Sequence, residues 1–220
     1  DVIMLVDTFE WYIMPCANPD GYEYSHTKNR LWRKTRSHTK SIRGCRGVDP
    51  NRNWSFKWNK GGASNRKCSD IYAGPKAFSE PETKAISDFI LSKNNRVKLY
   101  LDVHSYAQMW LTPWGWTSQL PTDYKDQYNL ASIGTKALKS VHGTNFNIGS
   151  STNLLYRASG GADDWAYGVA GVKYSYTVEL RDTGKHGFFI PTKQIIPSGE
   201  ETFAAVKAVA IALKNELFNN

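Results

Sequence analysis

Features that mark several large protein classes are scarce or absent in this sequence of 220 residues. No stretch approaches the ~20 consecutive apolar residues that a membrane-spanning helix needs. Three cysteines are too few for a disulfide-rich scaffold and too badly spaced for a structural zinc site. The absence of Gly-x-Ser-x-Gly disfavours a serine hydrolase, and the absence of His-Glu-x-x-His excludes the thermolysin-like class.

The start of the chain looks like a signal peptide only superficially. It contains Asp1, Asp7 and Glu10, and no basic stretch precedes its apolar part. It predicts instead the end of a helix that runs into a strand, as if the chain begins within a domain. We therefore expect an N-terminus that was truncated or processed.

Acidic residues are outnumbered, because 28 Lys and Arg stand against 20 Asp and Glu and give a formal charge of +8. The basic residues cluster mainly in Lys28–Arg46, beside Trp32. Such a cluster can attract nucleic acid, but no nucleic-acid-binding motif accompanies it. We favour a solvated basic surface on an extracellular protein and expect no nucleic-acid partner. A polyanion-binding protein remains an alternative, which strongly salt-dependent binding would mark.

The rest of the composition is that of an ordinary globular protein, with 40% apolar and 22% charged residues. No break in composition divides the chain, so we expect residues 1–220 to belong to one domain. Eight Trp and twelve Tyr predict a large core and a cleft lined with rings.

The cysteines allow one bridge. Cys45 and Cys68 both lie in polar, loop-like sequence, and a bond between them would stabilise the fold by roughly 3 kcal/mol. It would also place the protein in an oxidising compartment. Cys16, which follows an apolar run, is then expected to be a buried thiol.

Helical and strand patterns alternate along the chain, which predicts an α/β sandwich. The expected strands are Phe9–Pro15, Val97–His104 and Val172–Leu180, with a turn at Asn18–Gly21. The expected helices begin at capping boxes in Ser79–Glu82 and Ser198–Glu201, and a third covers Thr122–His142 and stops at Gly143.

The predicted helices have apolar stripes, and long loops lie between the elements. The stripes are Ala85, Ile86, Phe89 and Ile90 in one helix, and Phe203, Val206, Ala210, Leu213 and Leu217 in the last. The segments Ser37–Phe78 and Gln108–Pro121 are expected to be loops, and loops of this length are usually functional.

Two polar residues end predicted strands, where ligands gather in α/β sheets. They are His104 and Glu179, which together could supply a zinc ligand and a general base. Taken alone, each is more readily explained as a hydrogen-bonded core residue, and the two together favour a site. Because an unpaired buried carboxylate is costly, Glu179 needs a partner or a chemical role.

Arginines beside aromatic rings suggest an anionic ligand. They lie in Asn29–Arg36 and in Asn51–Trp54, and the planar guanidinium suits a carboxylate. The alternative for each segment is an arginine stacked on tryptophan as surface packing. Two adjacent carboxylates, Asp163 and Asp164, follow Tyr156, and one of them could cap the next helix while the other faces a pocket.

Taken together, these motifs resemble those of the zinc metallocarboxypeptidases of the pancreatic A/B type. They occur in the same order as in that family, and the resemblance extends from the first residues of the chain to its last helix. The resemblance implies a mixed β-sheet sandwiched between helices. The matching segments are Ala17–Gly21, Asn29–Ser37, Asp49–Trp54, Val103–Tyr106, Tyr156 with Gly160–Gly161, and Thr177–Gly184.

The resemblance also implies roles. His104 resembles the third zinc ligand, and Glu179 resembles the general base that activates zinc-bound water. Arg33 resembles the group that polarises the scissile carbonyl. Asn51 and Arg52 resemble the clamp for the free C-terminal carboxylate of the substrate.

Three further positions follow from the same resemblance. Tyr156 resembles the mobile ring that closes over substrate, and Cys45–Cys68 matches the family's disulfide. Asp163 occupies the specificity position, where an aspartate implies C-terminal Lys or Arg and an apolar residue implies hydrophobic side chains. Gly115 looks more like the A-type pocket wall.

The sequence departs from the family where the metal is concerned. The family's first two zinc ligands come from an upstream His-x-x-Glu motif, which is absent from this chain. We therefore expect an incomplete zinc site, and a domain that lacks its N-terminal strands and helix and needs that segment as a partner.

The resemblance implies a secreted zinc exopeptidase that acts on peptide or protein C-termini. It also implies a zymogen with a propeptide, and a possible protein inhibitor. The alternative is a non-catalytic relative that binds peptide C-termini without cutting. Because a pure binder has no use for a general base, Glu179 and Arg33 argue against this alternative.

Overall fold

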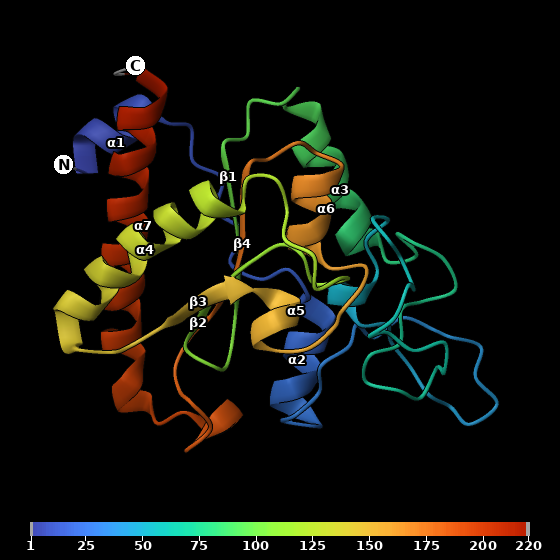
Figure 1. The fold of residues 1–220 in the computed structure, drawn as a ribbon. Coiled ribbons are helices and arrows are strands. Elements are labelled where there is room, and N and C mark those ends of the chain that lie inside the picture. The colour runs from blue at the N-terminus through green and yellow to red at the C-terminus, as the bar shows by residue number, and fades with distance from the viewer. Residues whose placement is uncertain (1, 219–220) are drawn as a thin grey trace.

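One mixed sheet forms the middle layer of this computed structural model, which describes residues 2–218 (Figure 1). The strand order is β1-β4-β2-β3, with β4 parallel to β1 and antiparallel to β2, and with β2 parallel to β3. The strands are β1 (Leu99–His104), β2 (Met109–Thr112), β3 (Asn147–Ser150) and β4 (Tyr174–Glu179).

Helices cover both faces of this sheet, which confirms the predicted sandwich. Helices α4 and α7 lie together on one face and α3 and α6 on the other (Figure 1). The α-helices are α1 (Val2–Thr8), α2 (Pro19–Thr27), α3 (Pro81–Ser92), α4 (Tyr124–His142), α5 (Ser151–Leu154), α6 (Ala162–Gly168) and α7 (Ile195–Phe218). Three short 3₁₀ turns are η1 (Pro50–Arg52), η2 (Gly187–Phe189) and η3 (Thr192–Gln194).

Two apolar clusters hold the layers together. The first packs Trp110 and Tyr176 of the sheet against Leu138 of α4 and Val209 of α7. The second packs Trp165 and Ala166 of α6 against Ile90 of α3 and against Trp54, which follows η1. None of the described helices combines the length and the apolar character needed to cross a bilayer.

Helices α4 and α7 approach each other closely at Gly134. A Cβ atom at this position would lie 2.9 Å from Val209 Cγ2 and 3.0 Å from the Trp110 ring. The helix ends as predicted, because Gly143 adopts the left-handed conformation (φ 78°) and donates to the Lys139 carbonyl.

The predicted N-terminal strand and turn are wrong. Residues 9–15 pair with no strand among the described residues, and Ile13 in this run is 82% exposed. The chain then begins helix α2, because Asn18 Oδ1 accepts from Gly21 N at 3.1 Å and Pro19 occupies the first turn. Cys16 is exposed, so the expected burial of this thiol is also wrong.

Both capping boxes differ from the prediction. Glu80 makes no side-chain cap, and Asn53 Oδ1 instead accepts from Glu80 N (3.1 Å) and Thr83 Oγ1 (2.9 Å) at the start of α3. Helix α7 begins at Ile195, before the predicted box.

The apolar stripes are also only partly confirmed, since each helix buries a narrower face than predicted. Ile90 is buried in α3, but Phe89 is 43% exposed. In α7, Ala210 and Leu213 are buried, whereas Phe203 and Leu217 are exposed.

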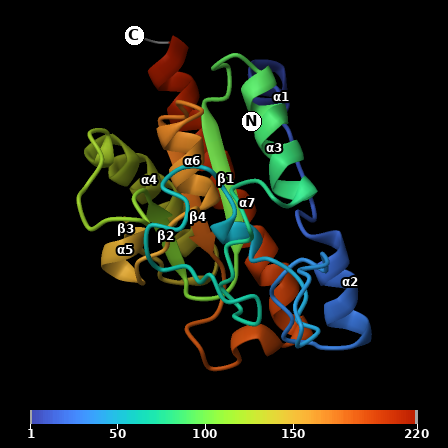
Figure 2. The same cartoon turned by 90° about the vertical axis from the view of Figure 1, so that its right-hand side faces the viewer.

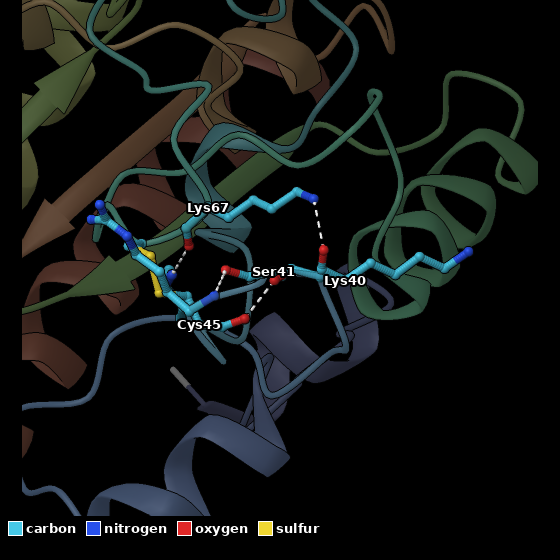
Figure 3. The surroundings of a disulfide bond; sticks show 8 residues. Lys40, Ser41, Cys45 and Lys67 are labelled. Atoms are coloured by element: carbon cyan, nitrogen blue, oxygen red, sulfur yellow. Dashed lines mark hydrogen bonds between the residues drawn. A yellow bond between two sulfur atoms is a disulfide. The ribbon is translucent and has the colours of Figure 1, made fainter.

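The chain between α2 and α3 runs mainly as loops near α2 (Figure 2), as predicted. A disulfide joins Cys45 to Cys68 within these loops (Figure 3). Strand β2, however, lies inside the segment predicted as a second loop, and strand β3 was not predicted.

Candidate active site

The sheet places two predicted residues directly side by side. His104 and Glu179 end the neighbouring parallel strands β1 and β4, and they are register partners. Parallel strands end at the same edge of a sheet, where α/β folds build their sites. The sequence therefore brings an imidazole and a carboxylate together without help from the loops.

The His104 ring is held by a carboxylate on its own strand. Asp102, two residues earlier and therefore on the same face, places Oδ2 2.9 Å from His104 Nε2. Burial lowers the pKa of His104, but attraction and hydrogen bonding to Asp102, with attraction to Glu179, raise it to about 9. Because a carboxylate only accepts, Nε2 keeps its proton, and Nδ1 is the nitrogen that could bind a metal in exchange for its own proton.

Glu179 is a half-buried carboxylate with spare bonding capacity. Its Oε2 is buried and makes no hydrogen bond with the described residues. Burial raises the pKa of Glu179, while nearby His104 and Arg33 lower it less, so the net shift is upward. A buried polar atom without a partner is uncommon in native proteins and points to a ligand or a chemical role.

One buried carboxylate, Asp49, organises the cations of the site. Its Oδ2 accepts from Arg33 Nε at 2.9 Å and lies 4.0 Å from Arg52 Nη1. Its Oδ1 accepts from Asn51 N at 3.0 Å and so caps η1. Burial lowers the pKa of Arg33, but attraction and hydrogen bonding to Asp49, with attraction to Tyr156 and Glu179, raise it overall, so the guanidinium stays charged.

Asn51 and Arg52 are tightly held on η1. Asn51 Oδ1 accepts from Ala162 N at 2.9 Å, and its Nδ2 lies 3.3 Å from His104 Nε2. Arg52 is 2% exposed and donates from Nε to the Gly62 carbonyl (2.8 Å) and from Nη1 to the Asn51 carbonyl (2.6 Å). These bonds fix the direction of both side chains before any ligand arrives.

The adjacent carboxylates of α6 have different surroundings. Asp164 accepts from Gly115 N (2.8 Å) and Trp116 N (3.0 Å), which ties the chain after β2 to α6. Asp163 is 5% exposed, and its Oδ2 accepts a hydrogen bond from Ser151 Oγ at 3.3 Å. Burial raises the pKa of both carboxyl groups, although attraction to His104 lowers that of Asp163, and neither carboxylate forms an ion pair with the described residues.

The wall opposite α6 leaves little room for a larger residue at Gly115. A Cβ there would lie 2.8 Å from the Ala158 carbonyl oxygen.

Neither Asp163 nor Asp164 caps α6 by a side-chain hydrogen bond, so the expected cap is not formed. Asp163 is thus the one of the two that faces the cleft.

Aromatic rings form the rim of the cleft. Tyr156, which follows α5, is 54% exposed. Phe188 packs edge-on against Tyr106 with centroids 4.9 Å apart, and its carbonyl accepts from Arg30 Nη2 at 2.6 Å.

All seven residues predicted for binding or chemistry line this one cleft: Arg33, Asn51, Arg52, His104, Tyr156, Asp163 and Glu179. Sequence reasoning did not find Asp49, Asp102 or Ser151, although each holds a predicted residue. Asp102 could have been found, because residues two apart on a strand share a face. Ser151 could not, because only the tertiary fold brings it to Asp163.

The fit to a zinc ion can be tested on the donor set. Catalytic zinc sites use three protein ligands and an open position. His104 is a suitable nitrogen donor, but residues 2–218 contain no group of three or more His, Cys, Asp or Glu side chains that could hold a metal ion. These residues alone therefore do not make a zinc site.

Comparison with known sequences identifies related proteins. A family model described as zinc carboxypeptidase matches residues 1–205. The chain is 56% identical over 211 residues to a carboxypeptidase B of Astacus astacus, and covers 70% of that protein. It is 46% identical to carboxypeptidase A2 of Rattus norvegicus and 46% identical to carboxypeptidase B of Homo sapiens. It spans about half the length of these two mammalian relatives, 49% and 52%.

Solved structures show the same fold. Bovine thrombin-activatable fibrinolysis inhibitor, in complex with tick carboxypeptidase inhibitor, matches with a TM-score of 0.90 and 40% identity. That match covers 94% of this chain and 70% of the bovine one. Carboxypeptidase A from Helicoverpa armigera matches with a TM-score of 0.87 and 34% identity, over 96% of this chain and 52% of the other.

Proposed function

Because this chain belongs to the zinc carboxypeptidase family, we propose that the complete protein is a zinc-dependent exopeptidase that removes C-terminal Lys or Arg. One observation carries the specificity. Asp163 is a buried carboxylate that faces the cleft and forms no ion pair with the described residues. A cationic substrate side chain would offset the cost of burying this carboxylate, whereas a phenyl ring would not.

The clamp for the substrate's terminal carboxylate is Asn51 with Arg52. Both are fixed by hydrogen bonds, and they lie in the same cleft as Asp163. A ligand with a carboxylate at one point and a cation at another has the charge pattern of a C-terminal lysine or arginine. Tyr156 on the exposed rim is suited to cover such a ligand.

The chemical step falls to Glu179 and Arg33. Glu179 is the proposed general base, since its raised pKa brings it closer to neutral pH and its Oε2 is free to take a proton. Arg33 is the proposed donor to the carbonyl oxygen as negative charge develops there, because Asp49 keeps it charged and oriented. A protein that only bound C-termini would need neither group.

The zinc is proposed to be held by His104 together with ligands from outside the described residues. We further propose that the protein is secreted, since the Cys45–Cys68 disulfide is favoured in an oxidising compartment. A propeptide and a protein inhibitor are proposed partners of the cleft. The inhibitor is supported by the related bovine structure, whose partner is a tick carboxypeptidase inhibitor.

The test is release of the last residue from two matched peptides, one ending in Lys and one in Phe, by the complete protein. Release of Lys in preference to Phe, abolished by a zinc chelator, is expected. Asp163→Asn keeps the size of the side chain and removes its charge. It should lower kcat/KM for the Lys peptide by roughly 30-fold or more, corresponding to about 2 kcal/mol, and leave the Phe peptide little changed.

Other outcomes would contradict specific parts of the proposal. Preference for Phe would keep the peptidase and refute the role of Asp163. Binding of both peptides without release, with zinc supplied, would identify a non-catalytic binder of C-termini. Chelator-resistant release would refute the dependence on zinc.

A further inference from the structure

The net positive charge of this protein comes from one segment of the chain. Residues 28–67 contain thirteen of the 28 Lys and Arg and only one of the 20 Asp and Glu, so they carry +12. The other 180 residues carry −4, and the formal total is +8. The basic character is therefore a local feature and not a general property of the surface.

Part of this charge serves the cleft, but most of it does not. Arg33 and Arg52 line the cleft, and Lys34 is buried with its Nζ 2.8 Å from the Lys67 carbonyl. The remaining cations do not line the cleft. Those near the disulfide, which we call the basic lobe, are Arg36, Lys40, Arg43, Arg46, Arg66 and Lys67.

The basic lobe is held in a defined shape by covalent and hydrogen bonds. The Cys45–Cys68 disulfide joins its two chain segments, and Lys67 Nζ donates to the Lys40 carbonyl at 3.2 Å (Figure 3). Within the first segment, His38 and Arg46 form an antiparallel bridge. The side chains thus project from a fixed backbone, although the segment has almost no regular structure.

No ion pair within the described chain neutralises these cations. None of the six makes an ion pair with a carboxylate of residues 2–218. Asp49, the one acidic residue of the segment, is buried and already serves Arg33 and Arg52. A cluster of like charges repels itself, and an external polyanion relieves that repulsion.

We propose that the basic lobe binds a sulfated polysaccharide. Sulfate groups along such a chain match several separated cations, and arginine can donate two parallel hydrogen bonds to an oxyanion. Binding would release counterions, so it should weaken steeply with salt. The site is separate from the cleft and does not depend on peptidase activity.

The aromatic rings beside the lobe argue for a polysaccharide over a nucleic acid. Single-stranded nucleic acid is held by bases that stack on exposed rings. Here Arg36 lies over Tyr24 (3.5 Å to the centroid) and over Trp32 (4.4 Å), so these rings are already covered. Residues 28–67 also offer no helix for a DNA groove, since their one helical element is the 3₁₀ turn η1. The disulfide further fits an oxidising compartment.

The test measures binding of the complete protein to heparin as a function of NaCl concentration. The lobe variant combines Lys40→Gln, Arg43→Gln and Arg66→Gln, three exposed residues whose side chains make no hydrogen bond or ion pair with residues 2–218. The matched control removes the same charge from α4 with Lys125→Gln, Lys136→Gln and Lys139→Gln. Helix α4 lies on the side of the molecule away from the loops (Figure 1).

The logarithm of the heparin-binding constant should fall less steeply with the logarithm of the NaCl concentration in the lobe variant. The magnitude of this slope should be smaller by about 2–3, roughly one for each cation removed. The control should leave that slope unchanged. Equal losses in both variants would show that only net charge matters and would overturn the proposal. Single-stranded DNA that binds more tightly than heparin, with the same loss in the lobe variant, would overturn the choice of ligand.

Two measurements separate binding from folding. Release of C-terminal Lys from a short peptide should be unchanged in the lobe variant, because none of its three positions lines the cleft. If the triple variant does not fold, Arg43→Glu replaces it, since Arg43 is exposed beside the fully exposed Ile42. This single charge reversal should lower the magnitude of the salt slope by about 1–2. An unchanged slope would refute the proposal that the basic lobe binds the polysaccharide.

Discussion

The role of Asp49 can be tested by replacing it with asparagine. Asp49→Asn keeps the Oδ1 acceptor that caps η1 through Asn51 N, but it replaces Oδ2 by an amide nitrogen. That nitrogen then faces Arg33 Nε, and two donors cannot bond to each other. The substitution therefore removes the anchor of Arg33 while the carboxylate clamp on η1 keeps its shape.

The magnitude follows from one charge-assisted hydrogen bond. Such bonds contribute about 1.5–3 kcal/mol. The Arg33 side chain is 35% exposed, so water replaces part of the lost interaction and the lower end applies. A loss of about 1.5 kcal/mol in the transition state lowers kcat/KM roughly tenfold. Because Arg33 is proposed to act on the developing oxyanion, kcat should fall more than KM rises.

The assay compares kcat and KM for a Lys-ending peptide in the wild type and in Asp49→Asn. Asp70→Asn is the matched control, because Asp70 is an exposed carboxylate that does not line the cleft. Near-ultraviolet circular dichroism checks that both variants remain folded. An unchanged kcat/KM in a folded Asp49→Asn variant would refute the positioning argument, and a pure rise in KM would assign Asp49 to the clamp instead.

Two further predictions concern stability. Gly134→Ala should lower the free energy of unfolding by about 1–2 kcal/mol, because overpacking against Val209 and the buried Trp110 ring exceeds the gain in helix propensity; chemical denaturation checks this, and a more stable variant would contradict it. For Asp182, slight burial raises the pKa, but the backbone N–H groups of Gly184, His186 and Gly187 bring it below its usual 3.8. The contribution of Asp182 to the free energy of unfolding is therefore full above pH 3.8 and is lost as the pH falls through the lowered pKa. Asp182→Asn should lower the urea midpoint of unfolding at pH 6, by an amount that shrinks toward pH 3. A difference that does not change with pH would contradict this reading.

The sequence predicted the sheet's long elements because their patterns are local. Strand β1 alternates apolar and polar residues, strand β4 is rich in residues that favour strands, and helix α4 is stopped by Gly143. Strand β2 was not predicted because Trp110 and Leu111 are both about 1% exposed, so no alternation of polar and apolar residues marks it.

The start of α2 shows a different limit. The residues Asn18 and Pro19 favour a turn and also favour the first turn of a helix. The choice between these depends on contacts with distant backbone, since Asn18 Nδ2 donates to the Lys34 carbonyl at 3.1 Å. Such contacts are not visible in a local pattern.

The cleft residues could be predicted from strand ends and from resemblance, whereas their supports could not. Asp49 was recognised as part of a motif, but its bonds to Arg33 and Arg52 depend on how two loops pack. The same holds for the link between Ser151 and Asp163, which joins the start of α5 to α6. The sequence thus predicts which side chains line the cleft more readily than it predicts which neighbours orient those side chains.

The pairing of His104 with Glu179 limits how this site can change during evolution. Neighbouring strands in a sheet are about 4.8 Å apart, so the backbone distance between these two residues is set by the hydrogen bonds of the sheet. No loop insertion or helix shift can alter it. Adjustments must come from side-chain length at these two positions, whereas Arg33 and Tyr156 lie in loops and Phe188 lies in the short turn η2, so that insertions can reposition them. We expect variation among related proteins to collect in those segments.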